Sequence, residues 1–113
     1  MNGKPRHTTA PPSTFDLKVE GKQAYITFNG DIDSTVVGAF REVAISLPPD
    51  LEIVVLDAKA VSFIDSYAVR VLTDLANKFS GRVVVLSPPP TLKFLLEITT
   101  LADLVTIQDA GSN

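Results

Sequence analysis

Apolar and polar residues alternate over the first part of the chain that carries a regular pattern. Every second residue is apolar over 15–19 and again over 24–28, with Gly21-Lys22 between the two segments. Alternation with a period of two is typical of a strand that buries one face. The pattern predicts two half-buried strands joined by a short turn, so we expect the chain to open with a β-hairpin.

Three later segments place apolar residues at three- and four-residue intervals, the spacing of one helical face. The first, residues 34–47, is followed by Pro48-Pro49, which stops a helix. The second, residues 66–79, is followed by Ser80-Gly81, a pair typical of a helix C-terminus. These features predict two amphipathic helices of similar length.

The third helical segment follows Pro88-Pro89-Pro90 and carries Leu92, Leu95 and Leu96 on one side. The prolines force an extended connection, and the hydroxyl of Thr91 is the expected N-cap of a helix that ends near Thr99. Residues 100–103, Thr-Leu-Ala-Asp, have the spacing of a capping box and predict a further short helix or turn.

Short β-branched segments separate the predicted helices. Residues 51–56 and 82–86 are almost continuously apolar, which suits strands covered on both faces, and residues 104–107 can add a short last strand. Alternating strands and helices need right-handed crossovers and pair in parallel. We therefore expect an α/β fold with a mixed central sheet, opened by a hairpin, and helices packed against it.

Composition indicates one soluble globular domain, because the 113 residues are 45% hydrophobic and 20% charged. We expect a folded domain over 15–109, with flexible tails at 1–14 and 110–113. The longest apolar runs fall far short of the roughly 20 residues that cross a bilayer, and the first residues lack the apolar centre of a secretory signal. The sequence predicts a cytoplasmic protein without membrane insertion.

The net charge and the scarcity of cysteine and histidine argue against several classes of function. A net charge of −3 argues against direct nucleic-acid binding, which rests on clustered cations, and favours protein partners. Cysteine is absent and the only histidine, His7, lies in the predicted tail, so a Ser-His-acid site is not expected. The glycines form no phosphate-binding loop. We predict no metal, no cofactor and no enzymatic activity.

Four acidic residues fall just after predicted strands and are expected to gather at one edge of the sheet: Asp31, Asp33, Asp57 and Asp65. One interpretation is that Asp33, and Asp65 or Ser66, cap the helices that follow. Another is that Asp57 accepts a phosphate beside a carboxylate-bound Mg²⁺, as in response-regulator receiver domains. Receiver domains, however, do not open with a hairpin.

Two motifs resemble those of a known family. Gly30-Asp31-Ile32-Asp33 resembles the Gly-Glu-Leu-Asp motif of STAS domains, the fold of bacterial anti-sigma factor antagonists. Residues 61–69, together with Leu56-Asp57 before them, resemble the strand and the Phe-(Met/Ile)-Asp-Ser-Ser-Gly-Leu phosphorylation loop of that family. Residues 92–104 are similar to its late helix. The resemblance covers about residues 15 to 109 and implies a STAS fold.

The resemblance also implies a function. In the family, an ATP-binding anti-sigma kinase phosphorylates the serine after the loop aspartate; the unphosphorylated antagonist binds the kinase and frees a sigma factor. That serine corresponds to Ser66. The family's second serine, glycine and leucine are Tyr67, Ala68 and Val69 here. The residues expected to contact the anti-sigma factor or serine kinase are Asp33, Asp65, Ser66, Tyr67, Val69 and Arg70.

Two alternatives remain open at the level of sequence. The chain can be a STAS scaffold subunit of a transport or signalling complex, in which Ser66 acts only as a helix cap. It can also bind a nucleotide, as some relatives do, although no set of residues specifies a hydrolytic mechanism. The sequence leaves the oligomeric state undetermined.

Overall fold

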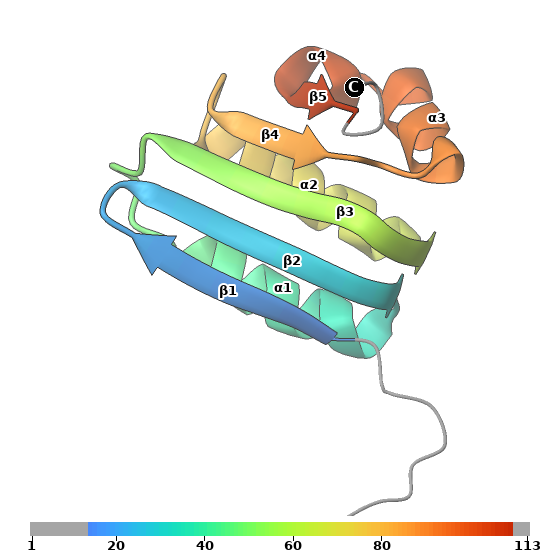
Figure 1. Cartoon of the computed structure of the whole chain (residues 1–113), viewed down its shortest axis with the longest axis horizontal. Coiled ribbons are helices and arrows are strands. Elements are labelled where there is room, and N and C mark those ends of the chain that lie inside the picture. The colour runs from blue at the N-terminus through green and yellow to red at the C-terminus, as the bar shows by residue number, and fades with distance from the viewer. Residues whose placement is uncertain (1–13, 110–113) are drawn as a thin grey trace, which may run out of the picture.

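The computed structural model describes residues 14–109, which form a sheet with helices packed against it (Figure 1). In chain order the elements are β1 (Thr14–Glu20), β2 (Gln23–Ile32), α1 (Ser34–Ser46), β3 (Ile53–Ile64), α2 (Ser66–Lys78), β4 (Val83–Leu86), α3 (Pro90–Ile98), α4 (Leu101–Leu104) and β5 (Thr106–Gln108). The predicted α/β fold is confirmed. The expected tails lie outside the described residues, apart from Thr14, which begins β1.

The sheet is mixed, with the strands in the order β1-β2-β3-β4-β5. β1 and β2 form the predicted antiparallel hairpin around Gly21, whose φ of 59° suits a residue without a side chain. β2, β3, β4 and β5 pair in parallel. Helices α1 and α2 are crossover connections that lie next to each other behind the sheet, whereas α3 and α4 lie near its β5 edge (Figure 1).

The predicted apolar stripes build the core between the sheet and the two crossover helices. Ala24, Ile26 and Phe28 of β2 are almost completely buried, and so is Phe40 of α1. The rings of Phe28 and Phe40 meet edge to face with centroids 5.1 Å apart. Such a pair contributes about 0.5–1.5 kcal/mol beyond the burial of its area. This packing holds α1 against the strand that precedes it.

Strand β3 is much longer than the predicted segment 51–56. Its pairing with β2 shifts register twice, between Thr27 and Asn29 and between Gly30 and Asp31, and each shift places an extra residue on β3. Such bulges break the alternation of buried and exposed residues, so the second half of β3 has no strand pattern in the sequence. Asp57 therefore lies within β3, and the expectation that it follows a strand is wrong.

The later helices begin differently from the prediction. Thr91 does not cap α3, because the helix already begins at Pro90, with Pro89 at the N-cap position and no side-chain cap bond. Proline suits the first helical position, where its missing N–H has no partner to lose. The capping box at Thr100 is also absent: no side chain caps α4, and the Asp103 N–H donates to the Thr100 carbonyl at 3.0 Å.

Candidate functional site

The starts of α1 and α2 lie side by side at one edge of the sheet. Because β2 and β3 are parallel, both strands end at this edge, and each is followed at once by its helix. The Asp65 N–H donates to the Ile32 carbonyl at 2.9 Å and ties the two strand ends together. We call residues 30–34 and 63–67 the helix-start edge.

Two aspartates cap the helices at the helix-start edge. Asp33 Oδ1 accepts from the N–H groups of Thr35 and Val36 at 3.1 and 3.2 Å, and Asp65 Oδ1 accepts from the Tyr67 N–H at 2.8 Å. Each cap stabilises its helix by about 1 kcal/mol. The capping interpretation is confirmed for both aspartates, and Ser66 is not a cap, because it is the first residue of α2.

Ser66 presents its hydroxyl to solvent at the first turn of α2. Its side chain is exposed and makes no hydrogen bond within residues 14–109. The N–H groups at a helix start also stabilise a negative charge placed next to them. An enzyme can therefore reach and modify this hydroxyl without first breaking an interaction of the fold.

Large apolar side chains flank Ser66 on both sides in the sequence. Tyr67 is 73% exposed and Phe63 is 56% exposed. Tyr67 lines a hollow between α1 and α2, whereas Phe63 lines another beside the start of α3, so an apolar contact is available on two sides of the start of α2. Phe63 was not among the predicted contact residues, because its exposure depends on the second register shift on β3, which places it on the same face as its partner Asp31. Its signal was only its position in the motif.

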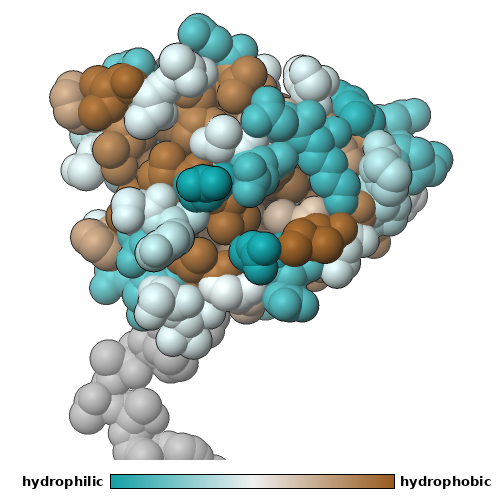
Figure 2. All heavy atoms as spheres, turned by 180° about the vertical axis from the view of Figure 1, so that it is seen from behind, coloured by the Kyte–Doolittle hydropathy of each residue, from teal (hydrophilic) through white to brown (hydrophobic). Residues whose placement is uncertain are grey.

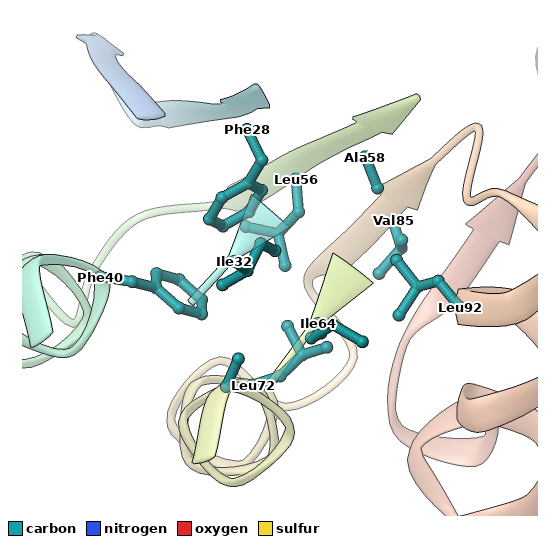
Figure 3. A pocket seen from close by; sticks show the side chains of 10 residues that line it. Phe28, Ile32, Phe40, Leu56, Ala58, Ile64, Leu72, Val85 and Leu92 are labelled. Carbon is teal, nitrogen blue, oxygen red and sulfur yellow. The ribbon is translucent and has the colours of Figure 1, made fainter. Parts of the chain in front are cut away.

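Ala68 stands where the family motif has glycine, and the structure accommodates its methyl group. Ala68 is buried in α2, and its N–H donates to the Asp65 carbonyl at 2.9 Å. The side chain lines a small cavity whose walls are all apolar, contributed by the sheet and by α1, α2 and α3 (Figure 3). The extra methyl group therefore fills space inside the core, and the cavity offers no reactive group.

The remaining predicted contact residues differ in how much of them a partner can reach. Val69 is half-buried against the core, so only part of its side chain is available. Arg70 is exposed and makes no ion pair within the described part of the chain. It lies four residues after Ser66 on α2, which places the two side chains on the same side of the helix.

The four acidic residues do not gather as expected. Asp33 and Asp65 follow their strands at the helix-start edge. Asp31 lies within β2 and Asp57 within β3, where Asp57 Oδ1 accepts from the Lys59 N–H at 3.2 Å. Between residues 14 and 109 no group of three His, Cys, Asp or Glu side chains has the arrangement of a metal site. Nor does this part of the chain contain a helix long and apolar enough to cross a membrane.

Comparison with known proteins identifies the family to which this chain belongs. A model of the STAS domain matches residues 14–111. A putative anti-sigma factor antagonist from Thermotoga maritima is similar at 20% identity and TM-score 0.73, over 87% of this chain and 88% of that one. A Mycobacterium paratuberculosis anti-sigma factor antagonist is similar at 20% identity and TM-score 0.69, over 92% of each chain.

The phosphorylated form of the Bacillus cell fate determinant SpoIIAA is also similar, at 18% identity and TM-score 0.67, over 85% of this chain and 92% of that chain. A search of curated protein sequences found no significant match. At these identities the solved structures support the fold alone. The family model covers most of the chain, and the protein belongs to the STAS domain family. Its structural neighbours include several anti-sigma factor antagonists.

Proposed function

We propose that the protein is an anti-sigma factor antagonist. It binds an anti-sigma factor that is also a serine kinase, releases a sigma factor and loses this affinity when Ser66 is phosphorylated. The observation that carries the proposal is the state of Ser66: an exposed hydroxyl without a hydrogen bond, directly after a capping aspartate and between the exposed side chains of Phe63 and Tyr67. The role is non-enzymatic and cytoplasmic.

The contact surface consists of the helix-start edge and the first turns of α2. Asp33 and Asp65 each use Oδ1 for a cap, so their second oxygens are available to basic groups of the partner. Tyr67 supplies a large amphipathic side chain and Arg70 a positive charge. The exposed part of Val69 lies between them in the sequence. These residues combine an apolar contact with charges of both signs.

Phosphorylation of Ser66 acts on this surface through charge. A phosphate adds about −1.5 to −2 charges. Two unit charges about 6 Å apart at an effective dielectric of about 20 repel by roughly 3 kcal/mol, which is about a hundredfold in affinity. Because the Ser66 hydroxyl supports no contact in the fold, the phosphate changes binding and leaves the core intact.

A second candidate is a STAS scaffold subunit that uses apolar contacts. The exposed side chains of Phe94 and Ile98 on α3 favour it, since they add apolar surface away from Ser66. This role no longer includes Ser66 as a helix cap, because Asp65 is the cap of α2. A scaffold binds its partner equally well with serine or aspartate at position 66.

Mass spectrometry tests the proposal directly. The protein is incubated with ATP and each candidate anti-sigma kinase of its host, beside the variants Ser66→Ala and Ser62→Ala. Ser62 is a matched control, because it is an exposed serine on the neighbouring strand. A phosphate on Ser66 that only Ser66→Ala lacks supports the proposal. Absence of both phosphorylation and binding with every candidate contradicts it.

A further inference from the structure

Helices α1 and α2 leave an open groove between them on the side away from the sheet. Its floor is apolar and consists of Val37 and Gly38 of α1 and Val71 of α2. Ser34 and Tyr67 lie at its mouth, at the helix-start edge. Figure 2 views the molecule from behind the sheet and shows apolar surface between hydrophilic side chains on this face. We call this hollow the helix groove.

The rims of the helix groove carry two arginines, one on each helix. The side chains of Arg41 of α1 and Arg70 of α2 make no ion pair or hydrogen bond within residues 14–109. Other cations of the same region are engaged: Lys78 Nζ donates to the carbonyls of Ala44 and Leu47 at 3.0 and 2.7 Å. The two guanidinium groups are therefore available to an external anion.

The charge of the groove contrasts with that of the whole chain. Asp74 also lines it, so its side chains carry two positive charges and one negative charge, whereas the chain has a net charge of −3. Arginine forks bind carboxylates in a two-bond geometry. A bound segment that carries carboxylates beside an apolar strip would match the groove, because its carboxylates can pair with the arginines of the rims and its apolar strip can pack on the floor.

Gly38 is responsible for part of the hollow. A Cβ atom built on Gly38 would meet no atom within 4 Å, so packing does not require glycine here. Glycine is also the least favourable residue inside a helix apart from proline. A side chain at this position would project into the groove and improve the helix, which separates an effect on binding from an effect on folding.

We propose that the helix groove binds an acidic, amphipathic helical segment of the anti-sigma partner, with Arg41 and Arg70 holding its carboxylates. The inference rests on the proposed function and names the chemistry of the partner. The lining residues span 34–41 of α1 and 67–74 of α2, about 12 Å along each helix, which is enough to seat about two turns of a bound helix. The mouth of the groove at Tyr67 makes this surface continuous with Ser66.

Phosphorylation of Ser66 also affects binding in the helix groove. Ser66 and Arg70 are four residues apart, and an acidic group placed four residues before a basic one on a helix forms a favourable pair. A phosphate on Ser66 therefore takes Arg70 as its own counter-ion. The acidic segment of the partner then loses one of its two cationic contacts and meets a new negative charge.

The test is titration of the full-length protein with the purified anti-sigma factors of its host. The groove variants are Arg41→Glu, Arg70→Glu and Gly38→Leu, and Ser66→Asp reports the proposed function separately. Lys18→Glu is the control for a reversed cation, because Lys18 is exposed on β1, does not line the groove, and forms its ion pair with the exposed Glu20 of the same strand. We expect each arginine reversal to weaken binding about tenfold and to flatten its salt dependence.

Gly38→Leu is expected to weaken binding at least about tenfold while the melting temperature rises. If leucine disturbs the fold, the affinities of Gly38→Ala and Arg41→Glu test the groove in its place. Unchanged affinity in Arg41→Glu and Gly38→Leu, with Ser66→Asp still weak, overturns the groove and leaves the proposed function standing; Arg70→Glu does not decide between them, because Arg70 belongs to both surfaces. No binding by the wild-type protein overturns both. A dimer of the protein alone that Gly38→Leu abolishes in sedimentation assigns the groove to a second copy and also overturns the inference.

Discussion

The polar side chains at the two ends of the parallel strands differ in the contacts that they make within the fold. At the end opposite the helix-start edge, Lys78 donates to main-chain carbonyls at the C-terminus of α1. The Arg82 guanidinium donates to the Leu51 carbonyl, and Lys22 pairs with Asp50. At the helix-start edge, the Ser66 side chain makes no such contact, and neither does that of Arg70 one turn further along α2. The first end uses its cations to hold the ends of helices and loops, whereas the second leaves the Ser66 hydroxyl without a contact in the described part of the chain.

This contrast separates stability from binding in a way that mutations can test. Substitutions at the cation-held end, residues 22, 44–52 and 78–82, are expected to change the free energy of unfolding. Substitutions at the exposed positions of the helix-start edge are expected to change partner affinity. The two capping aspartates contribute to both, because they stabilise helices and also lie on the contact surface.

The largest expected effect belongs to Ser66→Asp. Because the new carboxylate lies at the contact surface, we expect the affinity for the anti-sigma partner to fall by up to about a hundredfold. The melting temperature should stay within a few degrees of that of the wild type, since no contact of the fold is lost. Titration calorimetry and thermal melts measure the two quantities, with Ser62→Asp as the control for added charge.

At the opposite end, Lys78→Met is expected to destabilise the protein by about 2 kcal/mol, because carbonyls of Ala44, Ile45 and Leu47 lose a charged donor. Chemical denaturation measures this loss. Partner affinity at a temperature where the variant is folded should equal that of the wild type. A marked loss of affinity would place binding determinants at both ends of the strands.

Asp65→Ala and Asp65→Asn separate two roles of Asp65, its role as the helix cap of α2 and its role as a charge on the contact surface. Alanine removes the acceptor of the Tyr67 N–H and should cost about 1 kcal/mol of stability, whereas asparagine caps a helix nearly as well as aspartate. If the charge of Asp65 contacts the partner, both variants weaken binding in titration. Asp33→Asn provides the comparison at the start of α1, where the same substitution leaves the fold intact.

The smallest expected effect is a pH dependence at the cation-held end. The hydrogen bond and charge of Lys22 lower the pKa of Asp50, so the pair stabilises the fold above the ordinary carboxyl pKa of about 4. This contribution is lost as the pH falls through the lowered pKa. Denaturation between pH 5 and 3 should therefore cost the wild type slightly more stability than Lys22→Met. An equal loss of stability in the wild type and in Lys22→Met would show that the pair of Lys22 and Asp50 does not stabilise the fold.

Much of the fold follows from local pattern. The hairpin and the helices α1 and α2 are predictable because their apolar residues repeat with the period of the element and because Pro48 and Gly81 mark helix ends. The caps at Asp33 and Asp65 are predictable for the same reason, since each stands directly before an apolar helical stripe. Motif position then singles out Ser66.

Other features depend on pairing across the sheet or between helices and leave no local signal. The two register shifts on β3 hide the length of the strand, and they also decide that Phe63 is exposed. Arg41 and Arg70 come together only because α1 and α2 cover the same face of the sheet. The proline run misled the prediction of α3, because Pro90 itself can begin a helix.

The most direct test of the account compares the protein before and after phosphorylation of Ser66. The affinity of each form for the host anti-sigma kinase is measured by titration calorimetry, together with the melting temperature of each form. We predict that the phosphorylated form binds about a hundredfold more weakly at an unchanged melting temperature. Equal affinity of the two forms would contradict the switch, and a large drop in melting temperature would contradict its location on a free surface.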